Sequence, residues 1–375
     1  MPQSPSLFQP IEQQNRCSDC LSLGLEELPG PPGAPGTAQI DLHATLTFNT
    51  QWQSLLDGRV KLSLTGGRLQ LQFENAKLLA SGALAGAMED NSGRAVKTGS
   101  SQAPCWVFTS DLAAIALSGT IESVQLGRLQ VIERPCHVSA AFEVLPQNLY
   151  ISDAEGLWSH DISPNKHAIL ERTLVKFLHE TRFSPAISQV HWYYGDENPG
   201  PKPNGAREDA DCETKLRQQI ETLCTAQTDN FLELAKLAGL DPLADLAGGN
   251  LLGTDLSELD LSGATFQRVN LRGAVLSDTD LSEADLQGAK LSGADFSGAY
   301  LSSANLSGAD LHKASLALAN LGGANLQATN FKEANLSNIN LTSARVERAR
   351  FGSNPGLTEE LKRDLQQRGA IVEEG

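Results

Sequence analysis

The sequence predicts a mainly β protein built from two parts. The N-terminal part is predicted to be an antiparallel β-sandwich or barrel with one packed helix, and the C-terminal part a solenoid with helical caps. Two observations predict this division. Apolar and polar residues alternate over much of the first half, and from residue 246 the chain follows a strict five-residue period. The length of 375 residues is more than one ordinary core needs.

The first 36 residues indicate a disordered tail that ends in a linker. Residues 28–36 read Leu-Pro-Gly-Pro-Pro-Gly-Ala-Pro-Gly, which forms neither a helix nor a central strand. Cys17 and Cys20 form a single CxxC in this tail, with no second pair at zinc-ribbon spacing. We expect two reduced thiols there, and a redox or metal role is the alternative.

Residues 37–195 are predicted to form one β-rich domain closed by a helix. Apolar residues alternate from Ile40 to Phe48, as a half-buried strand requires. Two further alternating runs flank Gly66-Gly67, which predicts a β-hairpin. Residues 165–181 then change to helical spacing. A Pro- and Gly-rich linker is expected over 196–209.

The C-terminal third has an uninterrupted period of five. Every fifth residue from Leu246 to Phe351 is Leu, Phe or Val, which gives 22 centre residues in succession. The residue two before each centre is usually Ala, and the two residues after it favour Ser and Gly. Since strand side chains alternate, the centre and the Ala both point inward, and the small residues form a turn.

Each pentapeptide is thus expected to make one side and one corner of a coil, over residues 246–353. Open strand edges at the ends of such a coil need covering. We expect a helical cap over 210–245, and a C-terminal helix and tail over 354–375.

The repeats resemble those of the pentapeptide-repeat proteins. The resemblance rests on runs such as Ala284-Asp-Leu-Gln-Gly-Ala-Lys-Leu291 and Ala304-Asn-Leu-Ser-Gly-Ala-Asp-Leu311. It implies a right-handed, quadrilateral β-helix with four pentapeptides per coil, in which residues twenty apart stack. Phe331 would then stack on Phe351, and one face would carry a leucine ladder: Leu261, Leu281, Leu301, Leu321 and Leu341. The end of the chain resembles cyanobacterial members, which implies a cyanobacterial source.

Candidate chemical groups lie in the polar stretch 155–167. It contains His160, Asp161 and His167, residue types that bind metals or transfer protons. The spacing of the two histidines fits no standard ligand pattern, and capping of a strand-to-helix loop is the alternative interpretation. The sequence contains no nucleophile elbow, phosphate loop, dinucleotide fingerprint or zinc-protease motif. We therefore expect no enzymatic activity, cofactor or metal.

Two residues interrupt the polar surface expected for the solenoid. Tyr300 stands where Asp or Asn is usual, and Leu318 stands at a corner where Gly is usual. An aromatic and an aliphatic side chain on such a surface can form a contact patch, and drift within the repeats is the alternative.

The net charge and the apolar content of the sequence limit the classes of binding partner and the cellular location that we expect. A formal net charge of −16 argues against binding to nucleic acid or to anionic membranes. We see no signal peptide and no apolar stretch long enough to span a bilayer, and we expect a cytoplasmic protein.

The sequence therefore predicts a non-enzymatic protein-interaction or scaffold protein whose partner is another protein. The resemblance implies one alternative, a DNA-mimicking modulator of a type II topoisomerase. Residues 246–351 carry 11 acidic and 8 basic residues, and a net charge of −3 is small for a mimic of the phosphate backbone. A β-domain enzyme that uses the solenoid as a scaffold is the other alternative.

Overall fold

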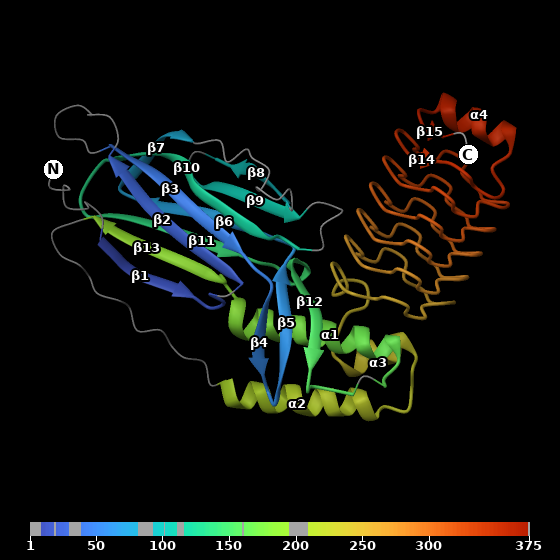
Figure 1. The fold of residues 1–375 in the computed structure, drawn as a ribbon, viewed down its shortest axis with the longest axis horizontal. Coiled ribbons are helices and arrows are strands. Elements are labelled where there is room, and N and C mark those ends of the chain that lie inside the picture. The colour runs from blue at the N-terminus through green and yellow to red at the C-terminus, as the bar shows by residue number, and fades with distance from the viewer. Residues whose placement is uncertain are drawn as a thin grey trace. The chain divides into compact units, whose positions relative to one another are not determined.

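The computed structural model describes residues 9–18, 20–29, 39–81, 93–100, 102–110, 116–159, 161–194 and 209–373 (Figure 1). The chain divides into two compact units. The sheet unit contains Met1–Glu155 and Phe177–Glu213, and the repeat unit contains Gly156–Lys176 and Thr214–Gly375. None of the helices in the described ranges has the length and apolar character that a membrane crossing demands.

The sheet unit is built from three antiparallel sheets. The six-stranded sheet has the order β1 (Gln9–Asn15), β13 (Ser188–Tyr194), β11 (Cys136–Glu143), β6 (Gly66–Glu74), β9 (Pro104–Ser110), β8 (Gly93–Gly99). The four-stranded sheet has the order β2 (Leu21–Pro29), β3 (Gln39–Phe48), β10 (Gly119–Val131), β7 (Ala76–Ser81). The three-stranded sheet has the order β12 (Leu149–Glu155), β5 (Gly58–Leu64), β4 (Gln51–Leu55). Each sheet has two free ends, so none closes on itself.

Three phenylalanines from two of these sheets meet in the core. Phe48 on β3, Phe108 on β9 and Phe142 on β11 have ring centroids 5.5 to 5.8 Å apart. All three side chains are buried. The alternation predicted for β3 is confirmed, because every second residue from Ile40 to Phe48 is buried. The mainly β, antiparallel character predicted for this part of the chain is confirmed as well.

The hairpin predicted around Gly66-Gly67 does not form. Both glycines lie inside β6, which pairs with β11 and β9, whereas the preceding strand β5 pairs with β12 and β4. A Cβ on Gly67 would lie 2.2 Å from Cε1 of Phe142, and one on Gly66 would lie 2.7 Å from the carbonyl oxygen of Phe108. Close packing on the core, rather than a turn, therefore explains the two glycines.

Two strands, β1 and β2, lie among the described residues of 1–36, where the sequence analysis expected a disordered tail. β2 pairs with β3 in a continuous antiparallel register, with Leu23 opposite Leu46. Leu21 and Leu23 are completely buried. An alternating apolar pair next to a sheet edge is enough to add a strand, because the edge supplies the backbone partners.

Cys17 and Cys20 are buried at the turn between β1 and β2. Their expected lack of a role stays a prediction. The predicted linkers fall almost wholly outside the described residues, since 30–38 and 195–208 are not among them.

Four α-helices are described. They are α1 (Pro164–Leu178), α2 (Asp209–Thr225), α3 (Phe231–Leu237) and α4 (Glu359–Gln367). Helix α1 continues into a π-helical turn over His179–Phe183, and a short 3-10 helix covers Pro146–Asn148. Helix α1 matches the helix predicted over 165–181, but its residues up to Lys176 belong to the repeat unit and not to the β-rich domain.

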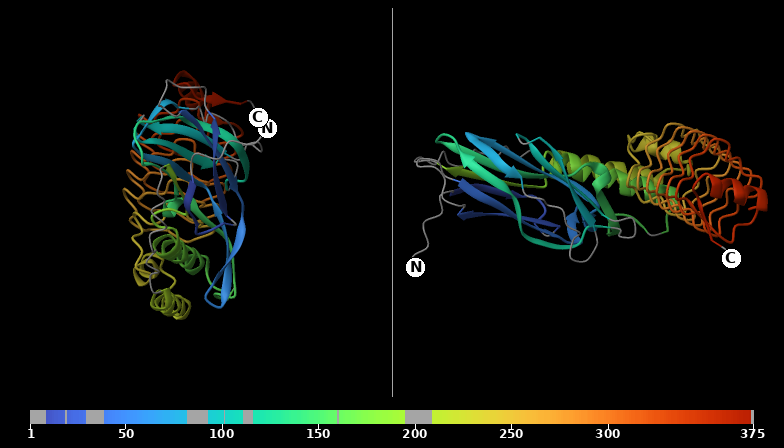
Figure 2. Two further views of the ribbon diagram at one scale, coloured as in Figure 1. Left: turned by 90° about the vertical axis from the view of Figure 1, so that its left-hand side faces the viewer. Right: turned by 90° about the horizontal axis from the view of Figure 1, so that it is seen from above.

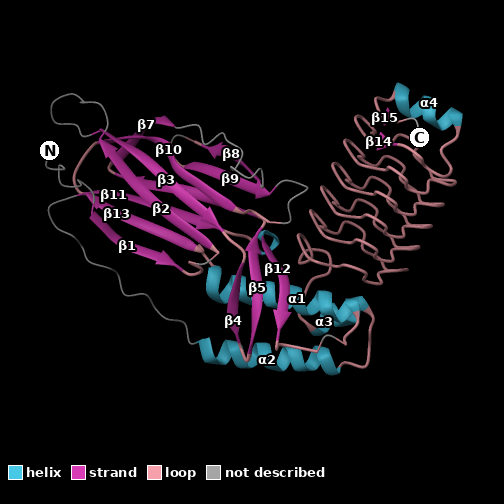
Figure 3. Cartoon of the chain, viewed as in Figure 1, coloured by secondary structure: helices cyan, strands magenta, loops and turns pink. Residues whose placement is uncertain are grey.

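The repeats form a stack of coils (Figures 1 and 2). Bridged residues in neighbouring coils are twenty residues apart, as predicted. Parallel bridges join Asp280 to Tyr300 and Tyr300 to Asn320. The N–H of Leu281 donates to the carbonyl of Tyr300 at 2.7 Å, and the N–H of Tyr300 donates to the carbonyl of Thr279 at 2.9 Å. Four pentapeptides therefore make one coil. Figure 3 draws most of the coil as loop, since each strand is a single bridge long.

Each corner of the coil is a turn with one left-handed residue. The second residue after every centre from Leu251 to Phe351 has a positive φ between 55° and 72°. The turn is closed by bonds such as the one from the N–H of Ala264 to the carbonyl of Leu261, at 3.1 Å. A positive φ at the third position is typical of a type II turn and explains the frequent glycines there.

The last coil is covered by the C-terminal segment. The Arg368 guanidinium donates to the carbonyls of Leu341 and Ala344, and the N–H of Ile371 donates to the carbonyl of Ala349 at 2.7 Å. β14 (Arg350–Phe351) pairs in parallel with β15 (Ile371–Val372). Backbone groups of the last coil, which has no further coil to pair with, are thus hydrogen-bonded to the C-terminal segment.

The alanine column gives a direct test of the interior. Ala294 is fully buried, so a leucine at this position has to force its neighbours apart. We expect Ala294→Leu to lower the free energy of unfolding by about 1 to 3 kcal/mol in a denaturant melt. Ala317→Leu, at a half-exposed turn position, is the control and should change it by less than about 0.5 kcal/mol. Equal stability of the two variants would mean that the alanine column does not point inward.

Candidate functional site

The interior of the β-helix is filled by its own side chains. The predicted leucine ladder is buried from Leu261 to Leu341. Phe331 and Phe351 stack with centroids 4.9 Å apart and planes within 2°, as the sequence analysis predicted. Groups of the repeat unit that act on other molecules must therefore be on its outer faces.

The twenty-residue stacking assigns each centre residue to one of four faces. Face A has the centres Leu246, Phe266, Leu286, Leu306, Leu326 and Val346, and face B has Leu251, Leu271, Leu291, Leu311, Phe331 and Phe351. Face C has the centres Leu256, Leu276, Phe296, Leu316 and Leu336, and face D has Leu261, Leu281, Leu301, Leu321 and Leu341. We count with each face the two residues before its centre and the two after it.

Positive charge is confined to two of these faces. All eight Lys and Arg residues of 246–351 lie on faces A and B. Faces C and D carry no cation and seven acidic residues, which are Asp255, Glu258, Asp260, Asp278, Asp280, Glu283 and Asp295. Beyond Asp295, faces C and D have no charged residue up to Ser343. Although the net charge of the repeats is small, faces C and D are therefore acidic, and only in the earlier coils.

The uncharged stretch of faces C and D contains both residues singled out in the sequence. Tyr300 is 51% exposed on face D, and Leu318 is 67% exposed at the corner between faces C and D. Leu318 has a φ of 64°, a conformation that leucine rarely adopts. The stacking sets Leu318 one coil above Gly298, which precedes Tyr300 by two residues. The two exposed apolar side chains therefore project from neighbouring coils near the same corner.

The described residues of the polar stretch 155–167 are not grouped as metal ligands. His160 lies outside the described residues. Asp161 is exposed, and its N–H donates to Oγ of Ser159. His167 instead lies on α1, with Nδ1 at 3.2 Å from Oε1 of Glu171 and its ring edge-on to Trp158 at 5.8 Å. In the described ranges, no three or more His, Cys, Asp or Glu residues are grouped to hold a metal ion.

Helix α1 covers the open edge of the first coil, a role that sequence reasoning missed. The side-chain amide of Asn165 donates to the carbonyl of Asp255 at 3.1 Å, and its oxygen accepts the N–H of Asp255 at 2.8 Å. This pair of bonds replaces the backbone partner that a preceding coil would supply. Arg172 donates from Nε to the carbonyl of Asp245 at 2.8 Å. Capping of the solenoid thus accounts for these polar residues.

Two of the capping residues are charged and buried. Glu171 and Arg172 are 4% and 3% exposed. Burial raises the pKa of Glu171, against the favourable effects of His167, Asn250 and Arg172. Burial also lowers the pKa of Arg172 to about 10. A Glu-Arg pair in the middle of an apolar helical stripe was the sequence signal that could have revealed this contact.

Stacked five-residue coils with left-handed corners define a solenoid repeat protein. The family model for pentapeptide repeats, in eight copies, matches residues 243–278, 279–316 and 319–352. All matched residues lie in the repeat unit. A comparison with curated proteins gave no match.

Several solved structures are similar to the repeats. A pentapeptide repeat protein from Nostoc Pcc 7120 is 34% identical over 29% of this chain and 84% of its own, with a TM-score of 0.24. One from the Arabidopsis thaliana thylakoid lumen is 34% identical over 32% and 80%, with a TM-score of 0.24. Rfr23 from the cyanobacterium Cyanothece 51142 is 30% identical over 25% and 82%, with a TM-score of 0.16. The chain belongs to the pentapeptide repeat family.

Proposed function

We propose that the protein is a non-enzymatic interaction or scaffold protein that binds another protein through faces C and D of its β-helix. The observation that carries the proposal is the exposure of Tyr300 and Leu318 at one corner, within a stretch that has no charged side chain. Exposed aromatic residues in uncharged surroundings are enriched where proteins bind each other.

The backbone of the β-helix supports this use. Every coil is bonded to the next through inter-coil hydrogen bonds of the kind that join Leu281 and Tyr300. Side chains on successive coils therefore stand at a fixed spacing of about 4.8 Å. A rigid surface loses little conformational entropy on binding, so more of the contact energy appears as affinity.

The proposal is tested by comparing partners of the full-length protein with those of a surface variant. We expect Tyr300→Ala with Leu318→Ser to reduce recovery of the bound protein at least tenfold in affinity isolation, which corresponds to about 1.4 kcal/mol. Leu252→Ser is the matched control, because Leu252 is an exposed leucine, 55% accessible, on face B. Recovery of the same proteins by wild type and by the double variant would exclude this corner as the binding surface.

The charge distribution does not favour the DNA-mimicking alternative. Such a mimic needs an acidic stripe along the whole length of one side, whereas the acidic residues of faces C and D end at Asp295.

We infer a right-handed coil, a cytoplasmic location and a cyanobacterial source. We also infer that the six-stranded and four-stranded sheets form a sandwich, since Phe48 of one sheet packs against Phe108 and Phe142 of the other.

A further inference from the structure

Three cations lie near one another on faces A and B of the β-helix, and they are Arg268, Arg272 and Lys290. Lys290 is bridged to Asn270 of the preceding coil, so it stands directly above this residue. Arg268 and Arg272 flank Asn270, two residues away on either side. Two extended residues span at most about 7 Å, and neighbouring coils lie about 4.8 Å apart. The three long side chains can therefore reach a common point.

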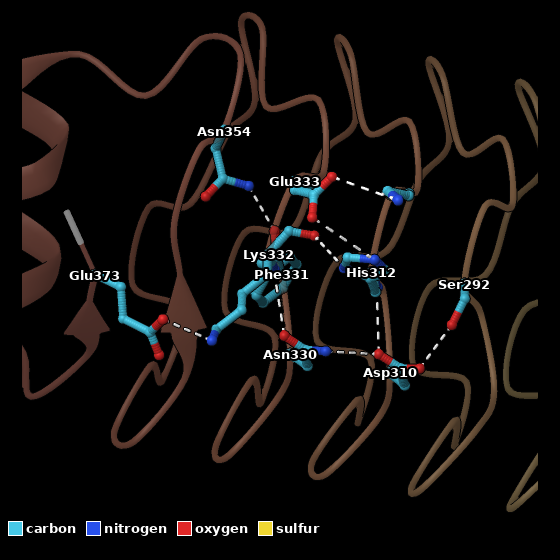
Figure 4. Close-up of polar contacts among 10 residues, drawn as sticks. Ser292, Asp310, His312, Asn330, Phe331, Lys332, Glu333, Asn354 and Glu373 are labelled. Atoms are coloured by element: carbon cyan, nitrogen blue, oxygen red, sulfur yellow. Dashed lines mark hydrogen bonds and ion pairs between the residues drawn. The ribbon is translucent and has the colours of Figure 1, made fainter. Parts of the chain in front are cut away.

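The acidic residues closest to these cations along the β-helix accept hydrogen bonds from uncharged side chains. Asp310 stands one coil above Lys290, and its oxygens accept bonds from Ser292 Oγ at 2.6 Å and Asn330 Nδ2 at 2.8 Å (Figure 4). Asp285 of face A accepts bonds from amide groups, among them Nδ2 of Asn305 at 3.0 Å. In the described ranges, neither carboxylate forms an ion pair with Lys290 or Arg272.

Three other cations of face B have acidic partners. Lys332 pairs with Glu373 (Figure 4). Arg350 also pairs with Glu373, and Lys313 pairs with Glu333. In the part of the chain that the structure describes, Lys290 and Arg272 make no ion pair. Arg268 has a further interaction of its own.

The surroundings of Lys290 make its charge costly. Its side chain is half-buried. Burial lowers the pKa of Lys290, and the positive charges of Arg272 and Arg268 lower it further. Like charges held together on a rigid frame repel each other, and a bound anion removes this repulsion.

We propose that Arg268, Arg272 and Lys290 form a binding site for a phosphate-type oxyanion on face B and at its corner with face A. Guanidinium groups present paired donors that match phosphate oxygens, and a lysine ammonium adds a point charge between them. The bound group is either free phosphate or the phosphoryl group of a peptide. The site is independent of faces C and D, so it extends the proposed function without resting on it.

The test is calorimetric titration of the full-length protein at constant ionic strength in chloride. The probes are inorganic phosphate and a short phosphoserine peptide, with the unphosphorylated peptide as reference. We expect saturable binding of one oxyanion per chain with a Kd of about 1 mM or tighter. Tighter binding of one probe identifies the source of the phosphoryl group, and both results support the site. Absence of saturable binding for both probes overturns the proposal.

Variants connect the binding to the three residues. Lys290→Met and Arg272→Gln should each weaken binding at least tenfold, and Lys290→Arg should keep it within about threefold, because the charge is retained. Arg345→Gln is the matched control, since Arg345 is exposed on face A of the last coil, and it should leave the Kd unchanged.

Circular dichroism melting curves show that each variant is folded before titration. Equal loss of binding in Arg345→Gln and Lys290→Met would reveal general charge attraction and would contradict the site. The Tyr300→Ala and Leu318→Ser variant should bind phosphate like the wild type, which separates this test from that of the proposed function.

Discussion

Replacing Arg172 with methionine is expected to lower the free energy of unfolding of the repeat unit by about 3 kcal/mol. Arg172 is buried and donates to the carbonyl of Asp245, and its charge favours the buried carboxylate of Glu171. Methionine keeps most of the side-chain volume of Arg172. It leaves the carbonyl oxygen of Asp245 and the carboxylate of Glu171 without this cation. Removing one partner of a buried charged group is costly because the other remains desolvated.

The effect should be local to the first coil. Hydrogen exchange measured by mass spectrometry is expected to show loss of protection in peptides that cover Leu251 and Leu256, while the last coils stay protected. Because each coil contacts only its neighbours, a weakened cap frays the adjacent end first.

Arg345→Met provides the control for the lost positive charge. Arg345 is exposed, so the change should alter stability by less than about 0.5 kcal/mol. If Arg172→Met melts at the same denaturant concentration as this control, the interaction of α1 with the first coil does not stabilise the solenoid.

The structure of the repeats could be predicted closely because the residue pattern that determines it lies within each pentapeptide. The centre residue, the alanine two positions before it and the small turn residues recur in every pentapeptide, so periodicity alone assigned the inward positions. Stacking of Phe331 on Phe351 then followed from the coil length implied by the family resemblance.

Long-range pairing explains what could not be predicted. Asn165 caps a residue ninety positions later in the chain, and no local pattern reveals that partner. Strand β2 was missed because its pairing with β3 depends on a neighbour beyond a Pro- and Gly-rich segment. Gly66-Gly67 suggested a turn, but the glycines are required by the ring of Phe142 and the backbone of Phe108.

The candidate surfaces were predictable to different degrees. Tyr300 and Leu318 were visible as departures from the repeat, and both are exposed in the structure. The cations around Lys290 were not, because Arg268 and Arg272 lie 22 and 18 residues before it and only the stacking of coils brings them together. The net charge of the repeats likewise did not reveal that all their cations lie on faces A and B.

Phe331→Ala is the second change for which we expect a large loss of stability. Phe331 is fully buried and lies flat against Phe351, so alanine removes a ring and leaves a cavity between two coils. Such substitutions cost about 3 to 5 kcal/mol. Asn354 also donates from its side chain to the carbonyl of Phe331, which links this coil to the C-terminal cap.

Phe331→Leu separates the lost volume from the lost aromatic contact. Leucine is the usual centre residue of the repeats, so this variant should lose less than about 1.5 kcal/mol. In hydrogen exchange, Phe331→Ala should expose the backbone of residues 326–351 and leave residues 256–276 protected, since coils contact only their neighbours. Uniform loss of protection along all coils would instead mean that the β-helix unfolds as one cooperative body, and the local role assigned to each cap would then be wrong.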